Sequence, residues 1–170
     1  MNIVLVGLSG SGKTTIGKLL EKYLSEMKFV DTDEIIVKRE NRSINDIFAT
    51  DGEQKFREIE KNVVNEVSEK NNLIISTGGG VVLNKENMLN LKKNGLIFYL
   101  RTSPEVIAER LKNDDTRPLL KVDDLKEKLY KMLEVRGCLY ETADITINTD
   151  ELSPEKAAET VIKEYENAGS

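Results

Sequence analysis

The chain has 170 residues, a formal net charge of −5 and 32% charged residues, as expected for one well-solvated globular domain over residues 1–170. The acidic balance disfavours a nucleic-acid-binding protein, which normally carries a basic face. The chain has no histidine and one cysteine, Cys138, which excludes a histidine general base, histidine metal ligands and an intrachain disulfide.

Five short apolar runs alternate with longer amphipathic stretches along the chain. The runs are predicted strands at Asn2–Val6, Phe29–Val30, Leu73–Ser76, Leu96–Leu100 and Ile145–Asn148. Runs that polar residues rarely break fit strands buried on both faces of a parallel sheet. The first run is too short for a signal peptide or a membrane span, so we expect a cytoplasmic protein without a membrane partner. We also expect a monomer, because no long exposed apolar run calls for a protein partner.

Apolar residues at helical spacing lie between these strands. They predict helices over Gly12–Met27 and Gln54–Lys70. Ser43 with Asp46 is a possible capping box, and serines before Pro104 and Pro154 mark two further helix starts. The alternation of strands and helices predicts an α/β fold, a three-layer α/β/α sandwich around a five-stranded parallel sheet.

The most specific motif follows the first predicted strand. Residues 7–14 read Gly-Leu-Ser-Gly-Ser-Gly-Lys-Thr and match G-x-x-x-x-G-K-[ST] in full. The glycines let backbone N–H groups turn inward as an anion nest, and the following helix adds the positive end of its dipole. Lys13 can reach the β- and γ-phosphates, and the Thr14 hydroxyl can bind Mg²⁺. The motif predicts a bound nucleoside triphosphate and leaves open whether the acceptor is water or a second substrate.

Two segments at predicted strand ends point to a second substrate. Asp31-Thr32-Asp33 would emerge beside the phosphate-binding loop. One carboxylate could hold the metal through water and the other could face a substrate hydroxyl, or both could cap the next helix. Thr77-Gly78-Gly79-Gly80 is expected to be a tight backbone site. A guanine-binding N-K-x-D motif is not found, because Asn84–Asn87 lacks the final aspartate.

Four arginines are further candidates. Arg57, Arg110 and Arg136 lie in helical patterns, where position alone favours solvated surface charges. Arg117 lies in the irregular stretch Asn113–Asp124, a predicted mobile loop. An arginine on such a loop could close over phosphates and stabilise charge on the equatorial oxygens.

Together these segments resemble the bacterial shikimate kinases, within the nucleoside-monophosphate-kinase-like P-loop family. The resemblance spans Ile3 to about Asn148, and it depends on Gly7–Thr15, Asp31–Asp33, Asp51–Glu60, Thr77–Gly80, Arg117–Leu120 and Arg136 with Leu139-Tyr140. It implies substrate-binding helices over about residues 32–70, a mobile lid over about 113–124, and phosphorylation of shikimate by ATP in aromatic amino-acid synthesis. In this family the glycine-rich strand end stands in for an acidic Walker B motif.

The resemblance also implies roles at matching positions. ATP contacts are expected from Gly10, Ser11, Gly12, Lys13, Thr14, Thr15, Arg110 and Arg117. Shikimate contacts are expected from Asp33, Arg57, Gly78, Gly79, Gly80 and Arg136, with the two arginines on the carboxylate. Thr14, with Asp31 through water, is expected to hold Mg²⁺. Lys13, Asp33 and Arg117 are the expected catalytic residues, and Asp33 would accept the proton of the reacting hydroxyl.

Two other functions stay open at this point. One is a kinase of the same fold that acts on another small metabolite, such as gluconate or a nucleoside monophosphate. The other is a noncatalytic nucleotide sensor, which the joint presence of Lys13, Asp33 and Arg117 disfavours. The stretch Asn148–Leu152 departs from relatives that carry a basic, nucleotide-contacting residue after the last strand.

Overall fold

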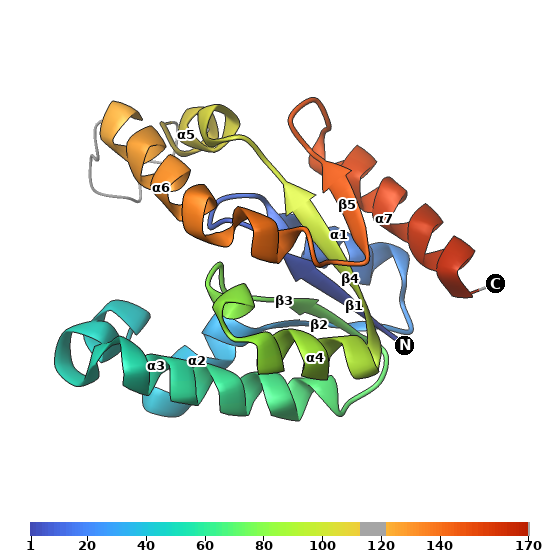
Figure 1. Cartoon of the computed structure of the whole chain (residues 1–170). Coiled ribbons are helices and arrows are strands. Elements are labelled where there is room, and N and C mark those ends of the chain that lie inside the picture. The colour runs from blue at the N-terminus through green and yellow to red at the C-terminus, as the bar shows by residue number, and fades with distance from the viewer. Residues whose placement is uncertain (113–121, 170) are drawn as a thin grey trace.

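One sheet of five parallel strands forms the centre of the molecule (Figure 1). The structure is a computed structural model, and it describes residues 1–112 and 122–169. The strands are β1 (Asn2–Val6), β2 (Lys28–Asp31), β3 (Leu73–Ser76), β4 (Gly95–Arg101) and β5 (Ile145–Asn148). Their order across the sheet is β2-β3-β1-β4-β5, and every neighbouring pair is parallel. The predicted five-stranded parallel sheet is confirmed.

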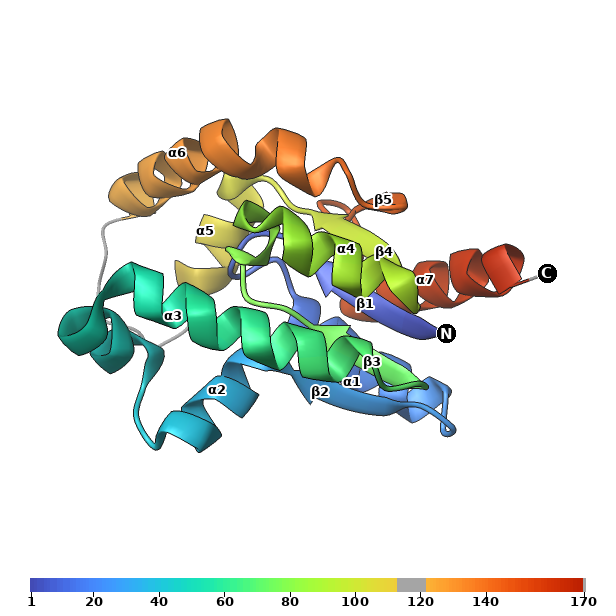
Figure 2. The same cartoon turned by 60° about the horizontal axis from the view of Figure 1, so that its bottom comes forward.

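Helices cover both faces of this sheet. On one face lie α1 (Lys13–Tyr23) and α7 (Pro154–Gly169), which pack against each other. The other elements build the second core: α2 (Thr32–Glu40), α3 (Ile44–Ser68), η1 (Val81–Leu83), α4 (Lys85–Lys93), α5 (Pro104–Lys112) and α6 (Val122–Tyr140). Figure 2 shows α3 and α4 lying side by side. This is the predicted three-layer α/β/α arrangement.

Burial on both faces explains why the central strands β1 and β3 are nearly unbroken apolar runs. All five residues of the central strand β1 are buried. Ile3 and Leu5 face the core under α1 and α7, whereas Val4 and Val6 face the opposite core. A strand with one face in solvent would instead carry polar residues at every second position, as the edge strand β5 does with Thr146 and Asn148.

The helix bounds differ from prediction at three places. α1 ends at Tyr23 instead of Met27, because Leu24 leaves helical geometry and the chain turns there. α3 begins earlier than Gln54, at the confirmed Ser43 capping box, and kinks at Gly52, whose φ of 83° lies outside the helical region. α6 begins at Val122, inside the stretch predicted to be an irregular loop. No helix among the described residues is long and apolar enough to cross a membrane.

Candidate active site

The phosphate-binding loop runs from the end of β1 to the start of α1. Gly10 and Gly12 have φ values of 86° and 91°, a left-handed conformation that side chains rarely adopt. Gly12 is the residue before the first turn of α1, so the free N–H groups of that turn face the loop. The Lys13 ammonium donates to the carbonyls of Gly7 and Leu8, both at 2.8 Å. The loop is therefore folded around its own lysine.

The Lys13 side chain is a buried charge. Only 7% of the residue is exposed. Burial lowers the pKa of its ammonium to about 8, against the opposing effect of the carboxylates of Asp33 and Asp31. Two carboxylates thus lie within electrostatic reach of the phosphate-binding lysine, as the sequence order at two strand ends predicted.

Asp31 connects the phosphate-binding loop to α2 through both of its carboxylate oxygens. Its Oδ1 accepts the backbone N–H groups of Asp33 at 2.9 Å and Glu34 at 3.3 Å, which caps α2. Its Oδ2 accepts the hydroxyls of Thr14 at 3.1 Å and Ser76 at 2.9 Å. Of the two interpretations of Asp31, cap and metal-site residue, the first is confirmed, and the position beside Thr14 is compatible with the second.

This group of oxygens fits magnesium rather than a transition metal. Mg²⁺ takes oxygen ligands and is usually held by one or two protein groups together with phosphate oxygens and water. Thr14 and Asp31 place a hydroxyl and a carboxylate oxygen together at the start of α1. Within residues 1–112 and 122–169, no cluster of three or more acidic or cysteine side chains offers an all-protein metal site.

Asp33 lies in the first turn of α2 and points its carboxylate into the interior. Its Oδ1 is buried and has no hydrogen-bond partner among the described residues. Burial raises the pKa of this carboxyl to about 6, and the carboxylates of Asp31 and Glu60 add to the shift while Lys13 and Arg57 oppose it. A Cβ on Gly78 would lie 2.7 Å from Oδ1, so a larger residue at position 78 would displace this oxygen.

Arg57 is held by a buried carboxylate instead of being a solvated charge. Its Nη1 donates to Glu60 Oε2 at 2.8 Å, and the Glu60 side chain is 1% exposed. Its guanidinium also lies 5.1 Å from the centre of the Phe56 ring. A Cβ on Gly80 would lie 2.4 Å from Nη2, so the guanidinium packs directly on the glycine backbone.

Both members of the Arg57–Glu60 pair keep a buried atom without a partner among the described residues, Nε of Arg57 and Oε1 of Glu60. Burial raises the pKa of Glu60, and the charges of Arg57 and Arg136 oppose the shift. Arg57 and Arg136, the two arginines predicted to act together, therefore both interact electrostatically with the Glu60 carboxylate. A partly buried guanidinium with spare donor capacity is suited to an anionic ligand.

Tyr140 joins α6 to the glycine-rich strand end. Its hydroxyl donates to the carbonyl of Gly79, and its ring stacks on Tyr99 with 5.0 Å between centroids. Burial raises the pKa of Tyr140 to about 12, and Arg136, one turn earlier in α6, opposes the shift. Tyr140 thus fixes the position of the helix that carries Arg136.

A cleft of about 390 Å³ opens where these segments meet. Its lining residues come from the phosphate-binding loop with the start of α1, from the ends of β2 and β3, and from α5: Ser9, Gly10, Gly12, Lys13, Thr14, Thr15, Asp31, Asp33, Ser76, Thr77, Gly79 and Arg110. A smaller cavity of about 100 Å³ adjoins it beside Thr15, Arg110 and Leu152. Arg110 donates to the carbonyl of Thr149 at 3.3 Å, so this arginine holds the loop after β5.

The structure gathers most of the predicted site residues at one edge of the sheet. Arg57 and Arg136 do not line the cleft, but both act on Glu60, and Arg57 also acts on Asp33. Arg117 and nearly all of the predicted lid lie outside the described residues.

Sequence reasoning gave no role to three residues at this site: Ser76, Glu60 and Tyr140. Ser76 pairs in register with Asp31 across β3 and β2, a signal that becomes usable once the strand order is known. Glu60 lies three positions after Arg57, between the buried Ile59 and Val63, so a carboxylate in an apolar helix face was the available signal.

Comparisons with known proteins agree with this geometry. A family model described as shikimate kinase matches residues 9–166. The shikimate kinase of Thermodesulfovibrio yellowstonii is 50% identical over 165 residues, covering 97% of this chain and 95% of the relative, and that of Caldicellulosiruptor saccharolyticus is 52% identical over 161 residues, covering 95% and 93%.

Solved structures give the same result. The shikimate kinase of Acinetobacter baumannii in complex with shikimate superposes with a TM-score of 0.88 at 35% identity, covering 98% of this chain and 93% of that one. The shikimate kinase of Aquifex aeolicus vf5 gives 0.84 at 37% identity, covering 99% and 98%. The chain therefore belongs to the shikimate kinase family, whose members are ATP-dependent kinases.

Proposed function

We propose that this chain transfers the γ-phosphoryl group of ATP to the 3-hydroxyl of shikimate, which yields ADP and shikimate 3-phosphate. The observation that carries the proposal is the position of Asp33. Its buried, unpaired carboxylate oxygen lies within electrostatic reach of both Lys13 in the phosphate-binding loop and Arg57 on α3. One carboxylate thus lies between a site for phosphate and a site for an anionic acceptor.

The nucleotide half of the proposal uses the loop between β1 and α1. Backbone N–H groups of residues 10–15 and the ammonium of Lys13 bind the β- and γ-phosphates, and Arg110 lies on the adenine side. Thr14, with Asp31 through water, would hold Mg²⁺. When bound there, the ion supplies neutralising charge to the phosphate oxygens.

The acceptor half uses the Arg57–Glu60 pair and Arg136. A planar guanidinium can bind a carboxylate through two parallel hydrogen bonds, and Arg57 is already partly shielded from water and oriented by Glu60. Arg136 approaches from α6, which Tyr140 fastens to Gly79. The lack of side chains at Gly78 and Gly80 lets the Asp33 carboxylate and the Arg57 guanidinium pack against the backbone of this segment, which brings both charged groups to the same side of it.

Asp33 is suited to accept the hydroxyl proton. Its pKa of about 6 is closer to neutrality than that of an ordinary aspartate, so it is ionised near pH 7 and still basic enough to act. Arg117 would add positive charge over the transferred phosphoryl group, and closure of the lid around it would exclude water. The role of Arg117 remains a prediction from the sequence.

An acceptor panel tests the proposal. ADP release from ATP–Mg²⁺ is measured with shikimate, gluconate, nucleoside monophosphates and no acceptor. We expect rapid release with shikimate alone. ADP release with another acceptor would favour a different small-metabolite kinase. ATP binding without ADP release in the presence of any acceptor would favour a sensor. The cytoplasmic location, the monomeric state and the single domain over 1–170 remain predictions.

A further inference from the structure

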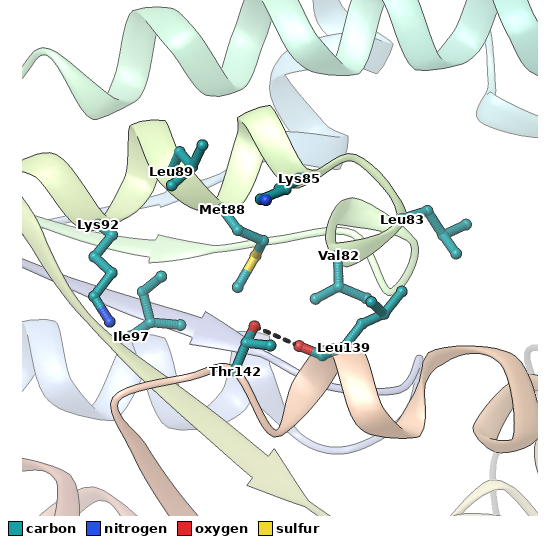
Figure 3. A pocket seen from close by; sticks show the side chains of 9 residues that line it. All are labelled: Val82, Leu83, Lys85, Met88, Leu89, Lys92, Ile97, Leu139 and Thr142. Atoms are coloured by element: carbon teal, nitrogen blue, oxygen red, sulfur yellow. Dashed lines mark hydrogen bonds between the residues drawn. The ribbon is translucent and has the colours of Figure 1, made fainter.

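A second cleft lies on the side of the molecule where η1, α4, β4 and the end of α6 meet (Figure 3). Its volume is about 290 Å³, at the lower end of the range of about 300–1,000 Å³ that is typical of ligand sites. Val82, Met88, Ile97 and Leu139 form its apolar wall. It shares no lining residue with the cleft that contains Asp33.

The charges at this second cleft are positive. Lys85 and Lys92 are among its lining residues, and no carboxylate is, although the whole chain has a net charge of −5. Lys92 is paired with Asp144, whose other oxygen accepts the backbone N–H of Ile97 at 3.0 Å. Lys85 has no ion pair with any residue in the described ranges 1–112 and 122–169, so its charge is available to a ligand.

We propose that this cleft binds a small molecule with a compact apolar body and one carboxylate. The apolar body would displace water from Val82, Met88 and Leu139, which is the main source of affinity in such pockets. The carboxylate would remain at the solvent-exposed mouth and pair with Lys85. The partly exposed Leu83 and Leu89 would lose contact with water at the same time.

Occupation of the cleft would act on the acceptor site. Val82 belongs to η1, which directly follows the glycines at 78–80, and Leu139 directly precedes Tyr140. The Tyr140 hydroxyl holds the carbonyl of Gly79, and α6 packs on η1. A ligand that fills the cleft would contact both η1 and the end of α6, and a shift of either element would loosen this hydrogen bond and weaken shikimate binding. This second effect rests on the proposed function, whereas the binding itself does not.

Binding is tested with 3-phenylpropanoate and its neutral counterpart 3-phenylpropan-1-ol, each titrated into the full chain and followed by backbone amide NMR. We expect saturable shifts around Val82 and Leu139, with the acid bound about 2- to 5-fold more tightly, as an exposed ion pair allows. Lys85→Gln should remove that preference. Lys18→Gln, an exposed lysine on α1 across the sheet, should keep it. Equal affinities in the parent, or shifts that do not saturate, would overturn the site.

A variant that fills the cleft tests its coupling to the acceptor site. Thr142 is exposed at the cleft, so Thr142→Phe can occupy the cavity, and Thr142→Val is the matched control because it also loses the hydrogen bond to the carbonyl of Leu139 but leaves the cavity open. In the parent, saturating 3-phenylpropanoate should raise the KM for shikimate about 5-fold or more and leave the KM for ATP unchanged. The filled variant should lose both the NMR response and the KM effect. Binding without a change in KM would refute the coupling, and absence of any shikimate turnover would refute the proposed function while the NMR result still stands.

Discussion

Gly80→Ala isolates the contact between the glycine-rich strand end and Arg57. The backbone of Gly80 has φ −96° and ψ 3°, which alanine can adopt, so the substitution introduces no backbone strain. The new Cβ would lie 2.4 Å from Nη2 and 2.6 Å from Nη1 of Arg57. The guanidinium would have to retreat by about 1 Å to reach an ordinary contact distance.

The size of the effect follows from what holds Arg57 in place. Its Nη1 is 2.8 Å from Oε2 of Glu60, and that carboxylate is buried, so a shift of this size breaks a hydrogen bond between charged groups. Such bonds contribute about 1.5–3 kcal/mol. Since about 1.4 kcal/mol corresponds to a factor of ten, the KM for shikimate should rise about 10- to 150-fold. The KM for ATP should change little.

The assay is ADP release with shikimate and ATP varied separately. Gly137→Ala is the matched control, because a Cβ on this α6 glycine meets no atom within 4 Å. A second control places the same methyl in an Arg57→Ala background, where it should have no further effect. An equal rise in KM with and without Arg57, or a Gly80→Ala enzyme within twofold of the parent, would refute the steric argument.

Three further predictions concern the charged groups of the site. Lys13→Ala should lower kcat by about 10²–10³-fold in steady-state assays, because a cation at the developing phosphate charge is lost, and turnover within a few-fold of the parent would contradict this. Arg136→Ala should raise the KM for shikimate by the equivalent of about 2–5 kcal/mol, and a change confined to the KM for ATP would disprove the clamp. The third uses the Asp33 pKa of about 6, raised from 3.8, in the metal-free enzyme. The folded state binds this proton more tightly than the unfolded state. The free energy of unfolding should therefore fall as the pH rises from about 4 to about 6, by at most about 3 kcal/mol. Urea unfolding of Asp33→Asn should lack that component, and an identical pH dependence would argue against the shifted pKa.

The sheet could be predicted because its central strands β1, β3 and β4 are buried at nearly every position and are therefore apolar runs. Three of the five strands have the predicted bounds, and the other two are longer than predicted by one residue at each end. Those two carry Lys28, Asp31, Gly95 and Arg101 at their ends, residues that a search for apolar runs leaves out.

The helix ends and the arginine environments were harder to predict. Gly52 interrupts α3 without ending it, because the capping box at Ser43 supports a separate first segment. Position alone predicted a surface charge at Arg57, and its half-buried state depends on Glu60 and on the approach of Gly80, which lies just before η1. Contacts between residues so far apart in sequence are set by the packing of layers, which local patterns do not encode.

The two carboxylate oxygens of Asp31 accept hydrogen bonds from different parts of the site, and this has a thermodynamic consequence. One oxygen starts the helix that carries Asp33, and the other accepts the hydroxyl of Thr14 beside the phosphate-binding loop. A displacement of Thr14 on nucleotide binding would therefore reach the backbone of Asp33 through one carboxylate group. Because such linkage is reciprocal, each substrate should alter the affinity of the enzyme for the other by the same factor.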